Sequence, residues 1–404
     1  MRILKVSPTY YPYLAEGGRP AKVRGIARAL VKRGHTVTIL TTYEGSPPEA
    51  AGLHNLERVP RGYRAQHDGG EVLYLDTSFR YRSVALNRGV IDFCHERVPG
   101  FDVVHVYGLY DLLGPVVGWH CRRLGIPYMV EPLGMMQPMD RSVTLKRTWK
   151  RMGKRYLNCA ARMVATSEQE RQEFVREGVP ADRIFLRYNG VDLEEFHKLP
   201  PRGIFRRKLG FGNGERLILF LGRIIPRKGA DHLIEALTEI AGTRAQLIIA
   251  GPEGESGYIQ FLQTKAAAAG VKSQVLFPGP IYEQDKMAAL VDADIFVLPS
   301  RYENFGNSVA EAMACDTPVI VTESCGIAAL VKDKAGLVIP YDPKALARSL
   351  SALLSDTSLY RRLKAGCKEV VSQISWDGLA EVMQQGYERV ISGRPPISSE
   401  AGSC

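Results

Sequence analysis

Short apolar runs alternate with amphipathic stretches along the whole chain, and this alternation is what most restricts how its 404 residues can fold. Apolar runs of this length suit buried strands, and the stretches between them are long enough for helices. Strands that alternate with helices form parallel sheets through crossover connections. A helix is predicted at Pro20–Arg33. The predicted strands are Ile3–Val6, Thr36–Leu40, Val103–Val106, Tyr128–Val130, Arg162–Ala165, Ile184–Arg187, Leu217–Leu221, Gln246–Ala250, Gln274–Phe277, Ile295–Leu298, Pro318–Val321 and Gly336–Ile339.

The series of strands restarts after Asn189–Asp192 and the polar stretch Leu193–Lys208, which predicts two doubly wound α/β domains. The predicted boundaries are 1–188 for the first domain and 189–375 for the second. A C-terminal helical segment at 376–391 and a mobile polar tail at 392–404 follow. Ligands of such sheets bind beyond the carboxyl ends of the strands, so we expect the site between the two domains.

Composition excludes several classes of protein. With 45% hydrophobic and 24% charged residues, the chain is not mainly disordered, collagen-like or a small disulfide scaffold. The seven cysteines are scattered and form no CxxC pair, which favours reduced thiols without a zinc site. No apolar stretch is long enough to cross a bilayer and the N-terminus does not resemble a signal peptide. We therefore expect a cytoplasmic protein whose membrane contact, if any, is peripheral.

The net charge of +10 is concentrated in the first half of the chain. Residues 1–190 contain 29 Lys and Arg against 18 Asp and Glu, whereas residues 191–404 contain 24 against 25. Such an asymmetry indicates an anionic partner for the first half, and a merely soluble basic surface is the alternative.

Two glycines follow the first predicted strand, in the sequence Glu16-Gly17-Gly18-Arg19-Pro20. Glycines allow close approach of the backbone to a ligand, and proline suits the first turn of a helix. A helix N-terminus behind such a pair can bind phosphate. The pattern is not GxGxxG, which argues against a simple dehydrogenase, and a purely structural turn remains an alternative.

A second strand-to-helix loop carries three cations and two glycines, in the sequence Gly222-Arg223-Ile224-Ile225-Pro226-Arg227-Lys228-Gly229. Arginine offers a rigid fork for phosphate oxygens and lysine a mobile point charge. The loop is therefore a candidate phosphate site, or else a solvated basic loop.

The most informative motif is Glu303-Asn304-Phe305-Gly306-Asn307-Ser308-Val309-Ala310-Glu311. A helix that begins near Gly306 would direct free N–H groups toward an anion. Glu303 precedes this helix and Glu311 lies about one turn inside it. Carboxylates accept hydrogen bonds from sugar and ribose hydroxyls, so the pattern suits a nucleotide sugar. Either glutamate alone would more simply face solvent.

Together these motifs resemble the family 4, or group 1, retaining glycosyltransferases, which have the GT-B fold of two Rossmann-like domains that face each other across a cleft. The likeness covers nearly the whole chain. It includes Glu16-Gly17-Gly18, Gly34-His35-Thr36-Val37, Asp102-Val103-Val104-His105, Thr166-Ser167-Glu168, Asn189-Gly190-Val191-Asp192, Gly222-Arg223 with Lys228-Gly229, Pro299-Ser300, the Glu303/Glu311 pair and Trp376.

The resemblance implies transfer of a hexosyl unit from a nucleotide-diphosphate sugar to a hydroxyl of a glycan or lipid-linked saccharide, without a metal or further cofactor. It implies that the segment from Trp376 crosses back onto the first domain, where the acceptor would bind. The implied catalytic residues are Arg223, Lys228 and Glu303. The implied donor-binding residues are Gly17, Gly18, Ile281, Phe305, Gly306, Asn307, Ser308 and Glu311, with the last on the ribose.

Three positions depart from the family pattern. Leu133-Gly134 replaces a frequent His-Gly that contacts the donor sugar, which bears on donor choice. Asp316 replaces a frequent glycine, and aspartate tolerates the left-handed backbone that this predicts. Ala329 replaces a frequent glutamate.

Two other functions fit the sequence less well. A GT-B epimerase would need a second acid/base group beside Glu303, and no candidate is apparent. A nucleic-acid-binding protein is suggested by charge alone, without a basic–aromatic platform. Asp292-Ala293-Asp294 spells the DxD of metal-dependent glycosyltransferases with another fold, but it lies between a helix and a buried strand. We expect it to act at a helix end and to bind no metal.

The segment 141–162 is the most basic part of the first half. Its 141–155 part combines seven cations, no acid, and apolar residues at helical spacing. This pattern is typical of a peripheral helix on anionic lipid, and a domain helix whose apolar stripe faces the core is the alternative. The cations are Arg141, Lys146, Arg147, Lys150, Arg151, Lys154 and Arg155, and the apolar stripe is Leu145, Trp149, Met152 and Tyr156.

Overall fold

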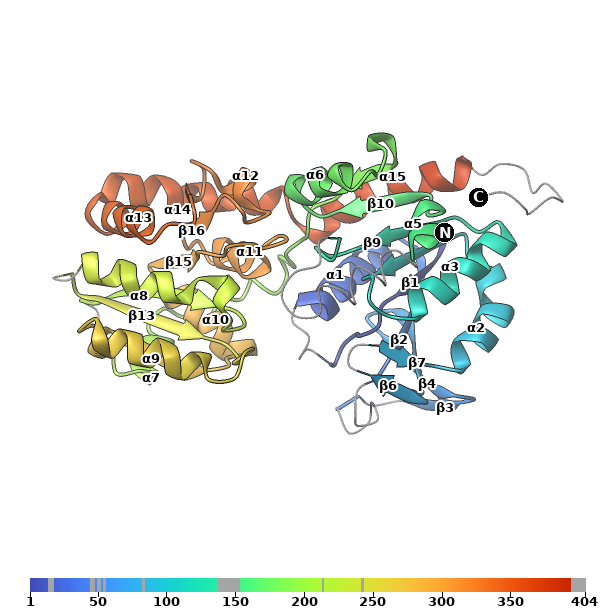
Figure 1. The fold of residues 1–404 in the computed structure, drawn as a ribbon, viewed down its shortest axis with the longest axis horizontal. Coiled ribbons are helices and arrows are strands. Elements are labelled where there is room, and N and C mark those ends of the chain that lie inside the picture. Colours follow the sequence, from blue (N-terminus) through green and yellow to red (C-terminus); the bar gives the residue numbers. More distant parts are fainter. Residues whose placement is uncertain are drawn as a thin grey trace. The chain divides into compact units, whose positions relative to one another are not determined.

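The computed structural model describes residues 1–13, 18–43, 48, 52–53, 56–81, 84–136, 153–212, 214–240 and 243–393. These residues form two compact units (Figure 1). Unit 1 consists of Met1–Gly190 and the C-terminal segment that begins at Trp376, and unit 2 is Val191–Ser375. The predicted tail lies outside the described residues from position 394 onward.

Unit 1 is built on a nine-stranded sheet with the strand order β11-β10-β9-β8-β1-β2-β5-β4-β3. Its strands are β1 (Arg2–Val6), β2 (Thr36–Thr42), β3 (Glu57–Val59), β4 (Gly62–His67), β5 (Gly70–Leu75), β8 (Val103–Tyr107), β9 (Tyr128–Glu131), β10 (Arg162–Ala165) and β11 (Ile184–Leu186), beside a small hairpin of β6 (Phe79–Tyr81) and β7 (Val84–Leu86). Its helices are α1 (Gly18–Lys32), α2 (Gly89–Arg97), α3 (Leu113–Leu124), α5 (Lys154–Asn158), α6 (Glu168–Arg176) and α15 (Trp376–Ser392), with 3-10 turns η1 (Val98–Gly100) and η2 (Ala181–Arg183).

Unit 2 has a six-stranded, wholly parallel sheet in the order β14-β13-β12-β15-β16-β17. Its strands are β12 (Arg216–Leu221), β13 (Ala245–Ala250), β14 (Val275–Gly279), β15 (Ile295–Leu298), β16 (Val319–Thr322) and β17 (Gly336–Ile339). Its helices are α7 (Ile204–Lys208), α8 (Ala230–Glu239), α9 (Tyr258–Ala268), α10 (Glu283–Asp292), α11 (Asn307–Ala314), α12 (Ala328–Val331), α13 (Pro343–Ser355) and α14 (Thr357–Ser372), with η3 (Pro226–Lys228) and η4 (Lys272–Gln274).

The predicted strands are all present, with ends that differ by at most two residues. The predicted parallel sheets are confirmed, and unit 1 adds an antiparallel edge that was not predicted, because β4 pairs antiparallel with both β3 and β5. The turn between β4 and β5 is Asp68-Gly69, with φ of 51° and 78°. Positive φ at both central residues is the tight turn that Asp-Gly favours between antiparallel strands. This dipeptide was the signal that would have predicted the hairpin.

Helix α15 belongs to unit 1, where Trp376 at its start is nearly buried against α1. A Cβ atom on Gly25 of α1 would lie 2.2 Å from the indole Nε1, and one on Gly190 would lie 2.4 Å from the same ring. Glycine at both positions therefore creates the slot that the indole fills. The guanidinium of Arg187 lies 5.7 Å from the centre of the ring and adds a cation–π contact.

The slot generates a stability prediction. Gly25→Ala should lower the free energy of unfolding by about 1–3 kcal/mol, because the new methyl group overlaps the indole and forces repacking. Urea denaturation followed by circular dichroism measures the change. Gly100→Ala is the matched control, since a Cβ there meets no atom within 4 Å. Equal stability of the two variants would contradict the packing role assigned to Trp376.

Candidate functional site

The sites predicted in unit 2 gather at the point where its strand order reverses. From β12 the chain moves outward through β13 and β14, and it then returns to place β15 on the other side of β12. The loop that carries Arg223 and Lys228 follows β12, and the loop that carries Glu303 follows β15. Because both strands are parallel, their carboxyl ends lie at the same edge, where ligands of doubly wound sheets bind.

Close backbone contacts hold these two loops together. Gly229 has φ of 71°, and a Cβ there would lie 2.1 Å from the carbonyl oxygen of Pro299. Arg301 donates its backbone N–H to the carbonyl of Arg227 at 2.8 Å. Glycine is thus required at position 229 for both conformation and space.

Lys228 and Glu303 form the central polar contact of the site. The Nζ of Lys228 lies 2.5 Å from Oε2 of Glu303, and their side chains are only 15% and 19% exposed. Burial alone would raise the pKa of Glu303, but the Lys228 ammonium and the backbone N–H of Phe305 outweigh burial and lower it. Glu303 is therefore ionised at neutral pH, so it accepts hydrogen bonds and does not serve as a general acid.

Helix α11 begins directly after this pair. Phe305 is buried and its carbonyl accepts from the backbone N–H of Ile327 at 2.9 Å, which anchors the approach to the helix. Gly306 is the N-cap with φ of 103°, and Cys325 Sγ lies 3.0 Å from where its Cβ would be. Asn307 and Ser308 form the first turn, where backbone N–H groups lack intrahelical acceptors and favour anions.

Three other predicted site residues lie on three different segments of unit 2. Arg223 is exposed just after β12, and Ile281 is half-buried in the loop between β14 and α10. Glu311 lies in the second turn of α11, and its Oε1 is 3.0 Å from Nζ of Lys286 on α10. Lys286 was not singled out from the sequence, because an isolated lysine in a helix carries no motif.

In unit 1, Gly18 is the exposed first residue of α1, whereas Gly17 lies outside the described residues. Strand order reverses here between β1 and β8, so the N-terminus of α1 lies at the corresponding position of this sheet. Leu133, in the loop after β9, has φ of 60°, a left-handed conformation that is rare for a bulky residue. The next backbone N–H, from Gly134, donates to buried Glu170 at 2.6 Å.

A buried ionic cluster next to this loop was not predicted. Glu131 at the end of β9 contacts Lys22 of α1, and Arg187 donates to its Oε2 at 2.5 Å. Burial lowers the pKa of Lys22 to about 8. His105 is also buried, with Nδ1 2.7 Å from the hydroxyl of Tyr387 on α15. Lysine and glutamate seldom lie in a core, so only knowledge of their pairing would have predicted the cluster.

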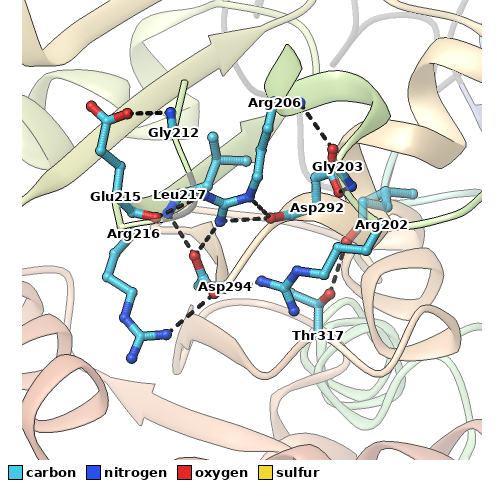
Figure 2. Close-up of polar contacts among 11 residues, drawn as sticks. Arg202, Gly203, Arg206, Gly212, Glu215, Arg216, Leu217, Asp292, Asp294 and Thr317 are labelled. Carbon is cyan, nitrogen blue, oxygen red and sulfur yellow. Dashed lines mark hydrogen bonds and ion pairs between the residues drawn. The ribbon is translucent and has the colours of Figure 1, made fainter. Parts of the chain in front are cut away.

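The Asp292-Ala293-Asp294 sequence acts at a helix end, as predicted (Figure 2). Asp292, the last residue of α10, accepts from the backbone N–H of Arg206 at 2.9 Å. Asp294 accepts from the side chain of Arg206 at 2.5 Å and from the backbone of Leu217 at 2.8 Å. The two carboxylates thereby attach α7 to β12.

Two further features concern ions and membranes. Among the residues that the structure describes, no group of three or more His, Cys, Asp and Glu side chains could hold a metal ion. The same residues include no helix long and apolar enough to span a bilayer.

Asp316 has φ of 57°, which confirms the predicted left-handed backbone.

Most of the basic segment, residues 137–152, lies outside the described residues. The described part contains Tyr156, whose ring stacks on Tyr128 with centroids 5.6 Å apart. The same ring lies 2.6 Å from where a Cβ on Gly118 would be. Tyr156 therefore faces the core of unit 1, and at this residue the alternative interpretation, a stripe that packs on the core, is the one that holds.

Two mostly parallel, doubly wound sheets of this order are characteristic of the GT-B fold. Whole-chain comparison agrees. Sucrose-phosphate synthase of Thermosynechococcus elongatus matches with a TM-score of 0.74 and 23% identity over 97% of this chain and all of that one. HepE of Anabaena in complex with UDP and glucose matches with a TM-score of 0.75 and 20% identity over the same shares.

Sequence comparison identifies the family. Residues 201–370 match the model of glycosyl transferases group 1, and residues 17–190 match that of the glycosyl transferase 4-like domain. D-inositol 3-phosphate glycosyltransferase of Xylanimonas cellulosilytica is 30% identical over 94% of this chain and 93% of the relative. An uncharacterized glycosyltransferase of Methanocaldococcus jannaschii is 26% identical over 96% and 98%. The chain belongs to the group 1 glycosyltransferases, which use nucleotide sugars.

The contact at Gly229 generates a prediction for the site. Gly229→Ala should reduce both stability and nucleotide binding, because its methyl group would separate the loops after β12 and β15. Gly222→Ala is the control, since its Cβ would approach only the Lys228 side chain, at 3.6 Å or more, which is ordinary van der Waals contact. Thermal melts with and without UDP measure both effects. A melting temperature of Gly229→Ala equal to that of Gly222→Ala would contradict this arrangement.

Proposed function

We propose that this enzyme is a retaining hexosyltransferase that moves a sugar from a nucleotide-diphosphate donor to a hydroxyl of a glycan or lipid-linked saccharide. The observation that carries the proposal is the half-buried Lys228–Glu303 pair in front of α11. A cation, an ionised carboxylate and a helix N-terminus at one point suit a diphosphate joined to a sugar. Cell-surface polysaccharide or glycolipid synthesis is the proposed setting.

The proposed reaction is a front-face displacement. The bond between the sugar C1 and the phosphate oxygen breaks, and the acceptor oxygen bonds to C1 on the same face. The departing phosphate oxygen takes the acceptor proton. Negative charge grows on the diphosphate in the transition state, where Arg223, Lys228 and the first amides of α11 stabilise it without a metal.

Each remaining residue has a proposed place. Glu303, with the backbone of Phe305–Ser308, holds the transferred sugar and its phosphate. Gly17 and Gly18 present backbone to the diphosphate from unit 1, and the main chain at Ile281 meets the base. Glu311 binds the ribose hydroxyls through its carboxylate. Leu133, in place of histidine, offers no ring nitrogen to the donor sugar, and this bears on donor choice.

The function is tested by incubating the enzyme with UDP-, ADP- and GDP-glucose and matched hexose variants, with EDTA present. UDP-glucose is the first choice because a HepE structure contains it. Lipid-linked and free saccharides serve as acceptors, and inositol 3-phosphate is included because the relative from Xylanimonas cellulosilytica is named for it. Transfer with retained anomeric configuration supports the proposal. Turnover of a nucleotide sugar to its epimer, without transfer, would favour the alternative enzyme class.

Variants of the central pair should separate binding from transfer. Lys228→Ala should weaken UDP binding and reduce kcat by about 10²–10³, because it removes a cation from the developing charge. Glu303→Gln should reduce transfer by a similar factor yet bind UDP at least as tightly, because a negative charge beside the diphosphate is lost. Calorimetry with UDP and product assays measure the two effects.

The pH dependence adds a control on this pair. Because the pKa of Glu303 is lowered below its usual 4.5, the charge pair persists throughout the neutral range and is lost only as the pH falls through that lowered value. UDP affinity of wild type and Glu303→Gln should therefore differ by a constant factor from about pH 7 to 8.5, a range above the pKa of about 6 at which the terminal phosphate of UDP loses its second proton. A difference that titrates within this range would contradict an ionised Glu303.

We further propose that the cations of 141–155 bring the enzyme to an anionic membrane, where a lipid-linked acceptor would lie. Support comes from the sequence alone, which places seven cations together without an acid, namely Arg141, Lys146, Arg147, Lys150, Arg151, Lys154 and Arg155. Binding to vesicles with 30% phosphatidylglycerol should weaken as NaCl rises from about 50 to 500 mM, because salt screens the attraction. Replacement of Lys146 and Lys150 by glutamine should weaken it further. Equal sedimentation with neutral phosphatidylcholine vesicles would refute the electrostatic contact.

A further inference from the structure

The ion pair between Lys286 and Glu311 joins two helices of unit 2. Lys286 lies in the first half of α10 and Glu311 in the second turn of α11. The two charged atoms, Nζ and Oε1, are 3.0 Å apart, and the side chains are 29% and 27% exposed. The pair is thus neither a solvated surface contact nor sealed in the core.

The groups around Lys286 keep its side chain protonated. Desolvation alone would lower its pKa, but the carboxylate of Glu311, followed by the field of Glu195, raises it above the usual 10.5. Lys286 therefore stays charged at neutral pH and lies in the field of two glutamates. Without it, Glu311 would lose its partner while the field of Glu195 remained.

The contact also uses one particular oxygen of Glu311. A carboxylate that donates nothing has two oxygens with which to accept, and Lys286 takes Oε1. Oε2 and the remaining lone pair of Oε1 are left for other donors. The two neighbouring hydroxyls of a ribose are donors of the kind that a held carboxylate can accept together.

Helix α10 itself connects this pair to the loop proposed for the base. Ile281 immediately precedes Tyr282, the N-cap of α10, and Lys286 follows Tyr282 by about one helical turn. The backbone N–H of Lys286 donates to the carbonyl of Tyr282 at 3.2 Å. The first turn of α10 therefore joins the loop at Ile281, which is proposed to meet the base, to Lys286, which contacts Glu311.

We propose that Lys286 is a positioning residue that orients the Glu311 carboxylate toward the ribose hydroxyls of the nucleotide donor. This inference rests on the proposed function, which assigns Glu311 to the ribose. Lys286 acts through Glu311 and makes no contact of its own with the diphosphate. It thereby sets how strongly the enzyme prefers a ribonucleotide over its deoxy forms.

The test compares UDP with 2′,3′-dideoxy-UDP by calorimetry, or the same two forms of whichever nucleoside diphosphate binds best in the donor panel. Wild type should bind the ribonucleotide about tenfold or more tightly, which corresponds to one charged hydrogen bond. Lys286→Met should lose most of this preference through weaker UDP binding, with the affinity for the dideoxy form unchanged. Lys286→Arg should restore much of it.

Asp285→Asn is the matched control. Asp285 precedes Lys286 on α10 and forms an exposed ion pair with Lys208 at 2.7 Å, so its loss removes a charge contact from the same helix. This variant should keep the full ribose preference. Melting temperatures of all variants show whether Lys286→Met is folded, and Lys286→Gln replaces it if the methionine variant is unstable.

Glu311→Gln separates failure of the inference from failure of the proposed function. Suppose that Glu311→Gln abolishes the ribose preference, and that the double variant Glu311→Gln with Lys286→Met shows no further change in nucleotide affinity. Lys286 then acts through Glu311. If both nucleotides bind more weakly to Lys286→Met, or if its preference is unchanged, the positioning role is overturned. If Glu311→Gln itself keeps the preference, the ribose assignment fails and the inference fails with it.

Discussion

Contact between the backbones of two loops is the constraint on which the rest of unit 2 depends. Gly229 lies against the carbonyl of Pro299, and on the other side of β12 a Cβ on Gly251 would lie 1.8 Å from the carbonyl of Gly222. Neither contact tolerates a side chain. They bring the strand ends so close that Lys228, from one loop, reaches Glu303, from the other.

In the proposed reaction, this closeness lets a short helix and a few side chains act on one diphosphate. An ammonium and a carboxylate that are mostly withdrawn from water interact more strongly than they would on the surface. Gly306 lets the backbone turn directly from Phe305 into α11, so the helix N-terminus lies beside the pair. The positions of these groups are set by the sheet, and little reorganisation is needed when charge develops.

Much of this arrangement could be predicted, since apolar runs mark each parallel strand and the glycine and charge motifs follow those strands directly. GT-B class and family were reached from motif order, and the comparisons confirm both. The antiparallel edge was missed although Asp68-Gly69 marks its turn, because polar and apolar residues alternate only weakly along β3, β4 and β5. Lys22, Glu131 and Lys286 were missed because each matters only through a partner distant in sequence. The roles assigned to the donor residues remain predictions.

The placement of Trp376 has a consequence for what each unit needs from the chain. Unit 2 is one continuous stretch whose ends meet, since the backbone N–H of Val191 donates to the carbonyl of Ile374 at 2.8 Å. Unit 1 is split, and the indole that fills its slot at Gly25 and Gly190 comes from beyond the whole of unit 2. A break in the chain before position 376 would therefore leave unit 2 with all its residues and unit 1 with an open slot.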